Sequence, residues 1–358
     1  MKQGWEVRQL GDLVEILDTK RKPITKRDRN PGEFPYYGAT GIVDYVDGYI
    51  FDEQLILLGE DGAKWNSGDQ SAFIITGKTW VNNHAHVLKP YRNILDDQWL
   101  VYNLNHQNLL SFVTGLTVPK LNQGQTKKIL IPTPPLEEQK QIVAKLDQCF
   151  EAIDKARANT AKNLENAKEL FQSKLNDIFS QKGDGWVEKK LGDVCSLEYG
   201  KPLPKEDRDP DGLYPAYGAN GIKTRTDKFL VNGRSIIVGR KGSAGEINYT
   251  EDKFWALDVT YYTKFDSNIL DLDFLYYLLS LLKLPKLAKG VKPGINRNDV
   301  YAITIQLPPL KEQSKIAIEM KHLENITNSL ESKYQQELNS LEELKKSILQ
   351  KAFEGELV

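Results

Sequence analysis

The chain carries the same framework twice, and this repetition constrains its fold more than any other feature. Trp5-x4-Leu10-Gly11-Asp12 returns as Trp186-x4-Leu191-Gly192-Asp193, 181 residues later, and residues 35–42 (Pro-Tyr-Tyr-Gly-Ala-Thr-Gly-Ile) return as 215–222, 180 later. The segment 134–139 (Pro-Pro-Leu-Glu-Glu-Gln) returns as 308–313 (Pro-Pro-Leu-Lys-Glu-Gln), 174 later. Units this long are not solenoid repeats, and each can form a domain of its own. The sequence therefore predicts two similar domains that differ by small changes in loop length.

Each half begins with a stretch that predicts mixed α/β structure. Short apolar runs such as 55–58 and 73–75, and 236–238 in the second half, stand between Gly, Asn and Asp clusters, which is typical of strands and turns. Broad apolar faces predict one helix over 97–113 and another over 272–282.

Each half ends with a stretch that predicts one long helix. Residues 136–179 and 310–353 contain neither proline nor glycine, and apolar residues recur at alternating spacings of three and four. Such a helix is roughly 65 Å long and cannot bury its apolar stripe on a small domain. We expect the two helices to pair with each other as an antiparallel coiled coil with pseudo-twofold symmetry. Pairing between two chains is the alternative.

The expected fold is thus α+β, with two mixed α/β domains joined by two long helices. The expected segments are a first domain over 1–134, a central helix over 135–182, a second domain over 183–308 and a C-terminal helix over 309–358.

Composition limits the classes of function. The formal net charge of the 358 residues is −1, which argues against general polyanion binding but permits local basic patches. The two cysteines, Cys149 and Cys195, lack metal-ligand spacing and are expected to be reduced thiols. No apolar signal core or membrane-spanning run is found, so we expect a soluble, cytoplasmic protein without a membrane partner.

Catalytic and cofactor motifs are missing from the sequence. No phosphate-binding Gly-x4-Gly-Lys-Ser/Thr loop occurs, and no Asn/Asp-Pro-Pro-Tyr/Phe element of the kind that amino-methyltransferases use. The glycine-rich segment 239–245 precedes no helix, which favours a turn that presents Arg240 and Lys241. His84 and His86 form His-x-His, for which we expect a structural or surface role and no metal. The chain is predicted to be non-catalytic and to bind no cofactor itself.

Basic and amide side chains recur in loops at similar places in both halves. Lys and Arg suit phosphate and guanine, whereas Asn and Gln suit adenine edges and phosphate oxygens. Solvated surface loops are the alternative interpretation of each cluster taken alone. The candidate DNA-contact residues are Lys20, Arg21, Lys22, Lys26, Arg27, Lys120 and Asn122 in the first half, and Lys201, Lys205, Arg225, Arg240, Lys241, Lys292, Asn296 and Arg297 in the second.

The doubled motifs carry a resemblance to a known family. Residues 129–142 (Ile-x-Ile-Pro-x-Pro-Pro-Leu-x-Glu-Gln-x-x-Ile) and 303–316 (Ile-x-Ile-x-Leu-Pro-Pro-Leu-x-Glu-Gln-x-x-Ile), with the two Trp-x4-Leu-Gly-Asp openings and the two Tyr-Gly segments, resemble specificity subunits of type I restriction–modification systems. The resemblance covers the whole chain. It implies two target-recognition domains, separated by two helical regions that pack as an antiparallel coiled coil.

The resemblance also implies a function and partners. Each recognition domain would read one half of an asymmetric, bipartite sequence in double-stranded DNA. The coiled coil would space the domains and dock two methyltransferase subunits, which would bind S-adenosylmethionine. Motor-nuclease subunits, which would use ATP, would join them. A stand-alone DNA-binding regulator and a coiled-coil scaffold without DNA contact are the alternatives.

Overall fold

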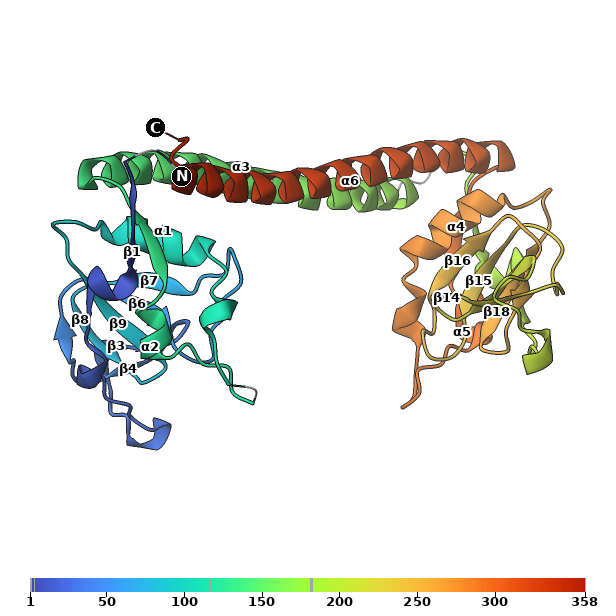
Figure 1. Ribbon diagram of the computed structural model, residues 1–358. Helices are drawn as coiled ribbons and strands as arrows, with labels where there is room; N and C mark the ends of the chain where they lie inside the picture. Colours follow the sequence, from blue (N-terminus) through green and yellow to red (C-terminus); the bar gives the residue numbers. More distant parts are fainter. Residues whose placement is uncertain (1, 3, 116, 181–182, 358) are drawn as a thin grey trace. The chain divides into compact units, whose positions relative to one another are not determined.

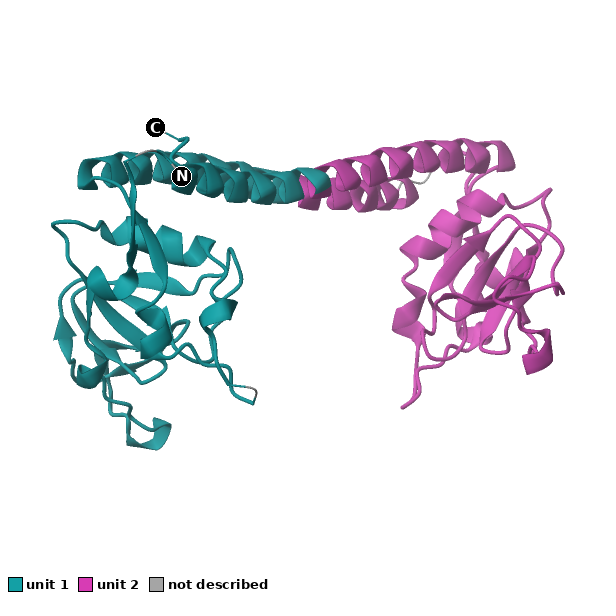
Figure 2. Ribbon diagram, in the orientation of Figure 1, with its two compact units in different colours: residues 1–161, 336–358 teal, residues 162–335 magenta. Residues whose placement is uncertain are grey.

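The computed structural model describes residues 2, 4–115, 117–180 and 183–357. The chain divides into two compact units, residues 1–161 with 336–358 and residues 162–335 (Figure 2). Each unit contains one globular domain and part of each of two long helices, α3 (Leu136–Ser180) and α6 (Leu310–Glu354). Both helices predicted from the sequence are therefore confirmed, and the compact units divide each helix near its middle.

The globular part of the first unit is built on two four-stranded sheets, in the orders β2-β9-β6-β7 and β4-β3-β8-β5, and a small pair β1-β10 (Figure 1). The fully buried strand β6 pairs antiparallel with both β7 and β9. The elements are β1 (Glu6–Gln9), β2 (Val14–Ile16), β3 (Pro31–Gly38), β4 (Gly41–Val46), β5 (Phe51–Asp52), β6 (Leu55–Gly59), β7 (Ala72–Ile75), β8 (Lys78–Val81), β9 (Ala85–Pro90), α1 (Asp97–His106), α2 (Gln123–Thr126) and β10 (Leu130–Thr133).

The second unit repeats this plan, which confirms the internal repeat. Its four-stranded sheet has the order β12-β18-β15-β16, beside a three-stranded sheet β14-β13-β17 and the pair β11-β19. The elements are β11 (Val187–Lys190), β12 (Cys195–Tyr199), β13 (Tyr214–Gly218), β14 (Gly221–Thr226), β15 (Ser235–Gly239), β16 (Ile247–Thr250), β17 (Trp255–Ala256), β18 (Thr260–Phe265), α4 (Leu272–Leu281), α5 (Arg297–Tyr301) and β19 (Thr304–Leu307).

Helix α1 is shorter than the sequence predicts: it ends at His106, whereas the prediction extends to residue 113. Gln107 is extended, and its side-chain amide donates to Asn103 of the last turn and to the carbonyl oxygen of Leu130. The side chain of Asn108 then accepts from the N–H of Leu110 and starts a separate short 3-10 turn. Local side-chain hydrogen bonds thus end the helix while the apolar pattern continues.

Within each unit, α3 and α6 run antiparallel. In the first unit, Arg157 pairs with Glu342 (3.1 Å) and Asp154 with Lys345 (3.5 Å), so the residue number falls along one helix as it rises along the other. Lys174 and Glu319 (3.3 Å) make the corresponding pair in the second unit. Buried side chains of the two helices include Leu146, Phe150, Ile153, Ala167 and Leu175 of α3, and Ile316, Met320, Ala352 and Phe353 of α6.

The spacing of three and four over 310–353 places Leu344 in the buried apolar stripe of α6, and this prediction is wrong. Leu344 fits the spacing pattern, but its side chain is 47% exposed. Its neighbours Leu341 and Ile348 contact the core instead, because they lie on the side of the helix that faces α1 and α3. The single spacing pattern does not distinguish a residue at the edge of the stripe from one at its centre.

The glutamine that closes each Pro-Pro-Leu-x-Glu-Gln segment ties a domain to its helix. Gln139 is fully buried, and its amide donates to the carbonyl oxygens of Ile94 (2.9 Å) and Pro134 (2.8 Å) while accepting from the N–H of Asp96 (2.9 Å). Gln313 makes the same three hydrogen bonds in the second unit, with Ile269, Pro308 and Asp271. This shared contact fixes the start of each long helix against the segment that begins α1 or α4.

The repeated Tyr-Gly segments form tight hairpins, and the backbone conformation at the second glycine of each requires glycine. Gly38 pairs with Gly41 between β3 and β4, and Gly41 has φ +130°. Gly218 and Gly221 repeat this pairing, with φ +114° at Gly221. Side chains are strained in this region of φ, so glycine is required there. Tyr36 and Tyr217, which precede the turns of these hairpins, are buried.

Candidate nucleic-acid interface

The two domains differ most at the turn that follows the central buried strand. Glu60 and Asp61 follow β6, and Arg240 and Lys241 follow β15 at the same repeat offset of 180 residues (240 − 60). The backbone is the same at both places. The N–H of Leu121 donates to the carbonyl oxygen of Glu60 (2.8 Å), just as that of Ile295 donates to Arg240 (3.0 Å). One framework therefore presents acidic side chains in one copy and basic side chains in the other.

In the first unit, this turn belongs to a network of ion pairs. The Arg21 guanidinium lies 2.5 Å from Glu60 and 3.3 Å from Asp18, and it also donates to the carbonyl oxygen of Ala85 (2.8 Å). Lys120 Nζ lies 3.0 Å from Glu60, and hydrogen bonding to this carboxylate raises the pKa of the lysine. The Arg21 side chain is only 12% exposed. Arg21 thus holds three loop segments together, and its predicted contact with DNA stays a prediction.

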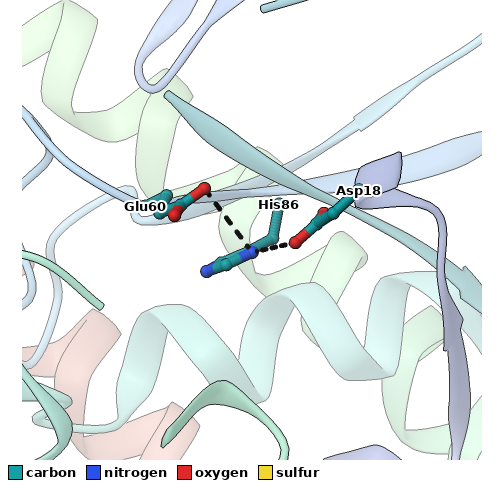
Figure 3. A group of neighbouring side chains, drawn as sticks. All are labelled: Asp18, Glu60 and His86. Carbon is teal, nitrogen blue, oxygen red and sulfur yellow. Dashed lines mark hydrogen bonds and ion pairs between the residues drawn. The ribbon is translucent and has the colours of Figure 1, made fainter. Parts of the chain in front are cut away.

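His86 lies at the centre of this network, between Asp18 and Glu60 (Figure 3). It is fully buried, its Nε2–H donates to the carbonyl oxygen of Leu121 (2.6 Å), and Nδ1 lies 2.6 Å from Asp18. Burial of Asp18 opposes ionisation, but hydrogen bonds from His86 and Val87 and the charge of Arg21 outweigh it and lower the pKa of the carboxyl. His86 is a structural residue here.

Asp18, Glu60 and His86 also form a possible metal-ligand group, since one ligand atom from each lies within 4.8 Å of the others. The side chains already supply the opposite charge, however. Both carboxylates are paired with Arg21, Glu60 is paired with Lys120 as well, and His86 uses Nε2 on a carbonyl oxygen. A buried carboxylate pair balanced in this way needs no cation. We assign the group to the ion-pair network.

In the second unit, the basic turn lies beside an exposed tyrosine. Arg240 and Arg297 both place their guanidinium groups over the ring of Tyr199, at 5.4 Å and 4.9 Å from its centre. The Arg240 guanidinium donates twice to the carbonyl oxygen of Asp258 (3.1 and 2.6 Å), and Arg297 reaches that of Leu197 (3.4 Å). Two predicted residues that lie 57 positions apart in the sequence (297 − 240) are thus brought together.

The remaining candidates lie partly on loops, but Arg225 lies within strand β14, and short 3-10 helices contain Lys20, Lys26, Arg27 and Lys205. Three of them have local structural contacts. Asn296 caps α5 through the N–H of Asn298 (2.9 Å), and Arg225 donates to the carbonyl oxygens of Gly212 and Leu213. Asn122 donates to Thr114 (2.6 Å). Exposed side chains are those of Lys20, Lys22, Lys26, Arg27, Asn122, Lys201, Lys205, Lys241, Lys292 and Asn296.

Sequence reasoning did not select Tyr199. It ends β12, just before Gly200-Lys201, and its ring is 48% exposed and packs against Tyr261. An aromatic residue at a strand end beside a basic loop is the available signal. That signal does not reveal Arg240 and Arg297, because their loops meet only in the folded domain.

Two further observations concern the chemistry of the chain. Cys149 and Cys195 are free thiols, and burial raises the pKa of Cys195 to about 12, which makes it a poor nucleophile. No helix in the described part of the chain is long and apolar enough to span a membrane.

Comparison with known proteins identifies the family. The model of the type I restriction modification DNA specificity domain matches twice, over residues 2–163 and 183–340. A putative type I restriction enzyme specificity subunit of Haemophilus influenzae is 26% identical over 350 residues, covering 92% of this chain and 90% of its own length. The putative MjaX specificity subunit of Methanocaldococcus jannaschii is also 26% identical, covering 99% and 94%.

Solved structures agree in fold. A chain from a study of complex assembly and conformational transition of the type I R-M system superposes with a TM-score of 0.76 at 20% identity, covering 100% of this chain and 99% of that one. The HsdS subunit from Thermoanaerobacter tengcongensis gives 0.63 at 20% identity, covering 100% and 98%. The two domains, the paired helices and the doubled family match agree, and the chain belongs to the family of type I restriction–modification specificity subunits, which are non-catalytic.

Proposed function

We propose that this chain recognises an asymmetric, bipartite sequence in double-stranded DNA, with one half-site for each globular domain. The observation that carries the proposal is the inversion of charge on a shared framework, Glu60-Asp61 in one copy and Arg240-Lys241 in the other. Direct readout depends on the donor and acceptor pattern that a protein presents to base edges. Two domains with different side chains at equivalent turns therefore favour two unlike half-sites over a palindrome.

The paired helices are the proposed docking site for two methyltransferase subunits. Helices α3 and α6 bury one stripe against each other and expose further apolar side chains, Leu170 (49%), Ile318 (72%) and Ile326 (41%), in the second unit. We take these exposed apolar side chains as candidates for a protein–protein contact. In this proposal the chain binds no cofactor, the methyltransferase subunits bind S-adenosylmethionine, and motor-nuclease subunits use ATP on cytoplasmic DNA.

Mapping of methyladenine in host DNA, with and without this gene, tests the proposal. We expect one bipartite methylated sequence, with two unlike halves and a fixed spacer, to disappear when the gene is deleted and to return on complementation. An unchanged set of methylated sequences in cells that express the chain would overturn the proposal. It would favour a regulator or a scaffold that acts without a methyltransferase.

Binding by the purified chain separates these alternatives further. The near-neutral net charge of −1 supplies little general attraction for DNA. We expect weak binding to the mapped sequence by the chain alone and much tighter binding after a modification subunit is added, at one salt concentration. Equal specific affinity in both cases would favour a stand-alone regulator.

A further inference from the structure

The described part of the second unit carries a group of four cations without an internal counter-ion. The ion pairs of this unit use Lys174, Lys228, Arg234 and Lys289 on the basic side, whereas Arg240, Lys241, Lys292 and Arg297 take part in none of them. Unpaired cations that lie this close together repel one another unless an anion binds.

Two backbone contacts bring these four residues to one place. The N–H of Ile295 donates to the carbonyl oxygen of Arg240 (3.0 Å), and the N–H of Gly242 donates to that of Pro293 (3.0 Å). Lys241 also forms an isolated β-bridge with Gly294. The 240–242 turn and the 292–296 loop, which leads into Arg297 at the start of α5, therefore lie side by side, and Lys241 and Lys292 on them are exposed.

The two arginines are held by neutral groups, which leaves donors for a ligand. Tyr199 lies under both guanidinium groups, and the carbonyl oxygen of Asp258 accepts two hydrogen bonds from Arg240. A guanidinium has five N–H donors, so most of them stay available. Tyr199 is half-exposed, so the ring and the two guanidinium groups over it are accessible from solvent. Arginine held in advance in this way loses less conformational entropy when it binds phosphate.

The first unit has no such group at the equivalent turn. Glu60 and Asp61 replace the two cations there, and they pair with Arg21 and Lys120. Asp18 adds a third carboxylate, paired with Arg21 and in contact with His86. Each carboxylate at this turn therefore has a cationic partner inside the protein.

We propose that Arg240 and Arg297, held on Tyr199 and flanked by Lys241 and Lys292, bind backbone phosphates of DNA, and that this anchor exists only in the second domain. The inference rests on the proposed function and names residues of the second domain that would contact the DNA backbone. Four clustered cations favour phosphate over a base edge, because a base edge presents at most two acceptors to one side chain, whereas phosphates lie along the whole duplex. The tyrosine is a positioning residue that holds both guanidinium groups.

Salt dependence of DNA binding by the full chain tests this proposal. Binding to a mixed-sequence duplex several helical turns long is measured by fluorescence anisotropy over a series of salt concentrations, for the wild-type chain and for R240Q/R297Q. The binding constant falls as salt rises, and each phosphate contact contributes about −0.9 to the slope of log K against log salt. The double variant is therefore expected to have a slope smaller in magnitude by about 2. A wild-type slope in the double variant, or no binding by the wild-type chain at the lowest salt, would overturn the proposal.

Matched variants isolate the cause. K189Q/K264Q removes the same charge from exposed positions on β11 and β18 of the same unit. It is expected to keep the wild-type slope, and R240K/R297K, which preserves the charge, is expected to keep it too. An equal decrease in K189Q/K264Q would contradict a localised anchor. If R240Q/R297Q fails to fold by circular dichroism, R297Q alone is expected to lower the slope by about 1.

The failure of this inference is distinguishable from failure of the proposed function. Phosphate contacts carry no sequence information, so R240Q/R297Q is expected to lower the extent of methylation in cells and leave the methylated sequence unchanged. A changed base in the motif would assign these residues to base reading and overturn the phosphate anchor, with the proposed function intact. Absence of any motif that depends on the wild-type gene overturns the proposed function itself.

Discussion

Gln139 and Gln313 show how a single buried side chain can join two elements. Replacing Gln139 with leucine leaves the N–H of Asp96 and the carbonyl oxygens of Ile94 and Pro134 without their partner. Buried unpaired groups cost about 1–3 kcal/mol each, and we expect Gln139→Leu to lower the free energy of unfolding of the first unit by about 3 kcal/mol. Urea denaturation measures this loss. Gln141→Leu, at an exposed position two residues along α3, is the control and should change stability by less than about 0.5 kcal/mol.

The environment of Asp18 leads us to expect that the stability of the first domain depends on pH in acid. Its pKa is lowered in the folded protein, so the folded state binds fewer protons than the unfolded state in acid. The resulting stabilisation is fully present above the ordinary carboxyl pKa of about 3.9 and is lost as pH falls through the lower folded value. We expect Asp18→Asn to be less stable than the wild type at neutral pH and to lose less stability below about pH 4. Urea midpoints over a pH series measure this difference.

The exposed carboxylate of Asp52 in the same domain provides the control for this prediction. Asp52→Asn should follow the wild-type pH dependence. If Asp18→Asn and the wild type lose stability in parallel below pH 4, the ion-pair network does not hold Asp18 ionised.

Single residues also show where sequence reasoning stops. The framework positions were predictable, because both copies repeat residues that make the same internal contacts, such as Gly41 and Gly221 at positive φ. The role of Arg21 was not predictable, since its partner Glu60 lies 39 residues away along the chain and meets it only in the folded domain. Tyr199 was missed because one aromatic residue at a strand end has no periodicity that would distinguish it.

At the level of elements, a short stretch of α6 contains one residue expected to stabilise the fold and one expected to bind a partner. Met320 is fully buried against the second-unit core, whereas Ile318, two residues earlier, is 72% exposed. We expect Met320→Ala to cost about 2–5 kcal/mol of unfolding free energy and Ile318→Ala less than about 0.5 kcal/mol. Thermal and urea unfolding measure both values.

One of these two variants also tests the proposed docking of partner subunits. Ile318→Ala is expected to weaken assembly with the methyltransferase subunit, because it removes exposed apolar surface without disturbing the helix pair. Isothermal titration calorimetry or analytical ultracentrifugation measures this. Unaltered assembly in Ile318→Ala, combined with the expected stability, would place the docking site elsewhere on the helices.

The long helices were predictable as elements, and the limits of helix α1 were not. A spacing of three and four over about 44 residues, interrupted in the first helix by Arg157 and Lys174, leaves few alternatives, and α3 and α6 are each 45 residues long. Helix α1 ends at His106 because side chains of Gln107 and Asn108 form local hydrogen bonds, an effect that the apolar pattern does not contain. Patterns predict which elements exist better than they predict where each element ends.

At the scale of the whole molecule, the two halves share a framework and differ in the charge of the turn that follows the central buried strand. Sheet order, helix starts and glutamine contacts repeat, whereas the turns after β6 and β15 carry opposite charges. If each domain reads its own half-site independently, the half-sites are exchangeable parts. An exchange of domains should then change the DNA target in a defined way.

The most direct test copies the first domain into the second position. Residues 4–133 replace residues 185–307, both long helices are kept, and methyladenine is mapped in cells that carry the modification subunit. Because the helices are antiparallel, we expect the methylated sequence to become an inverted repeat of the half-site read by the first domain, with the spacer unchanged. A chimaera that folds and methylates, but keeps the original asymmetric sequence, would contradict the account.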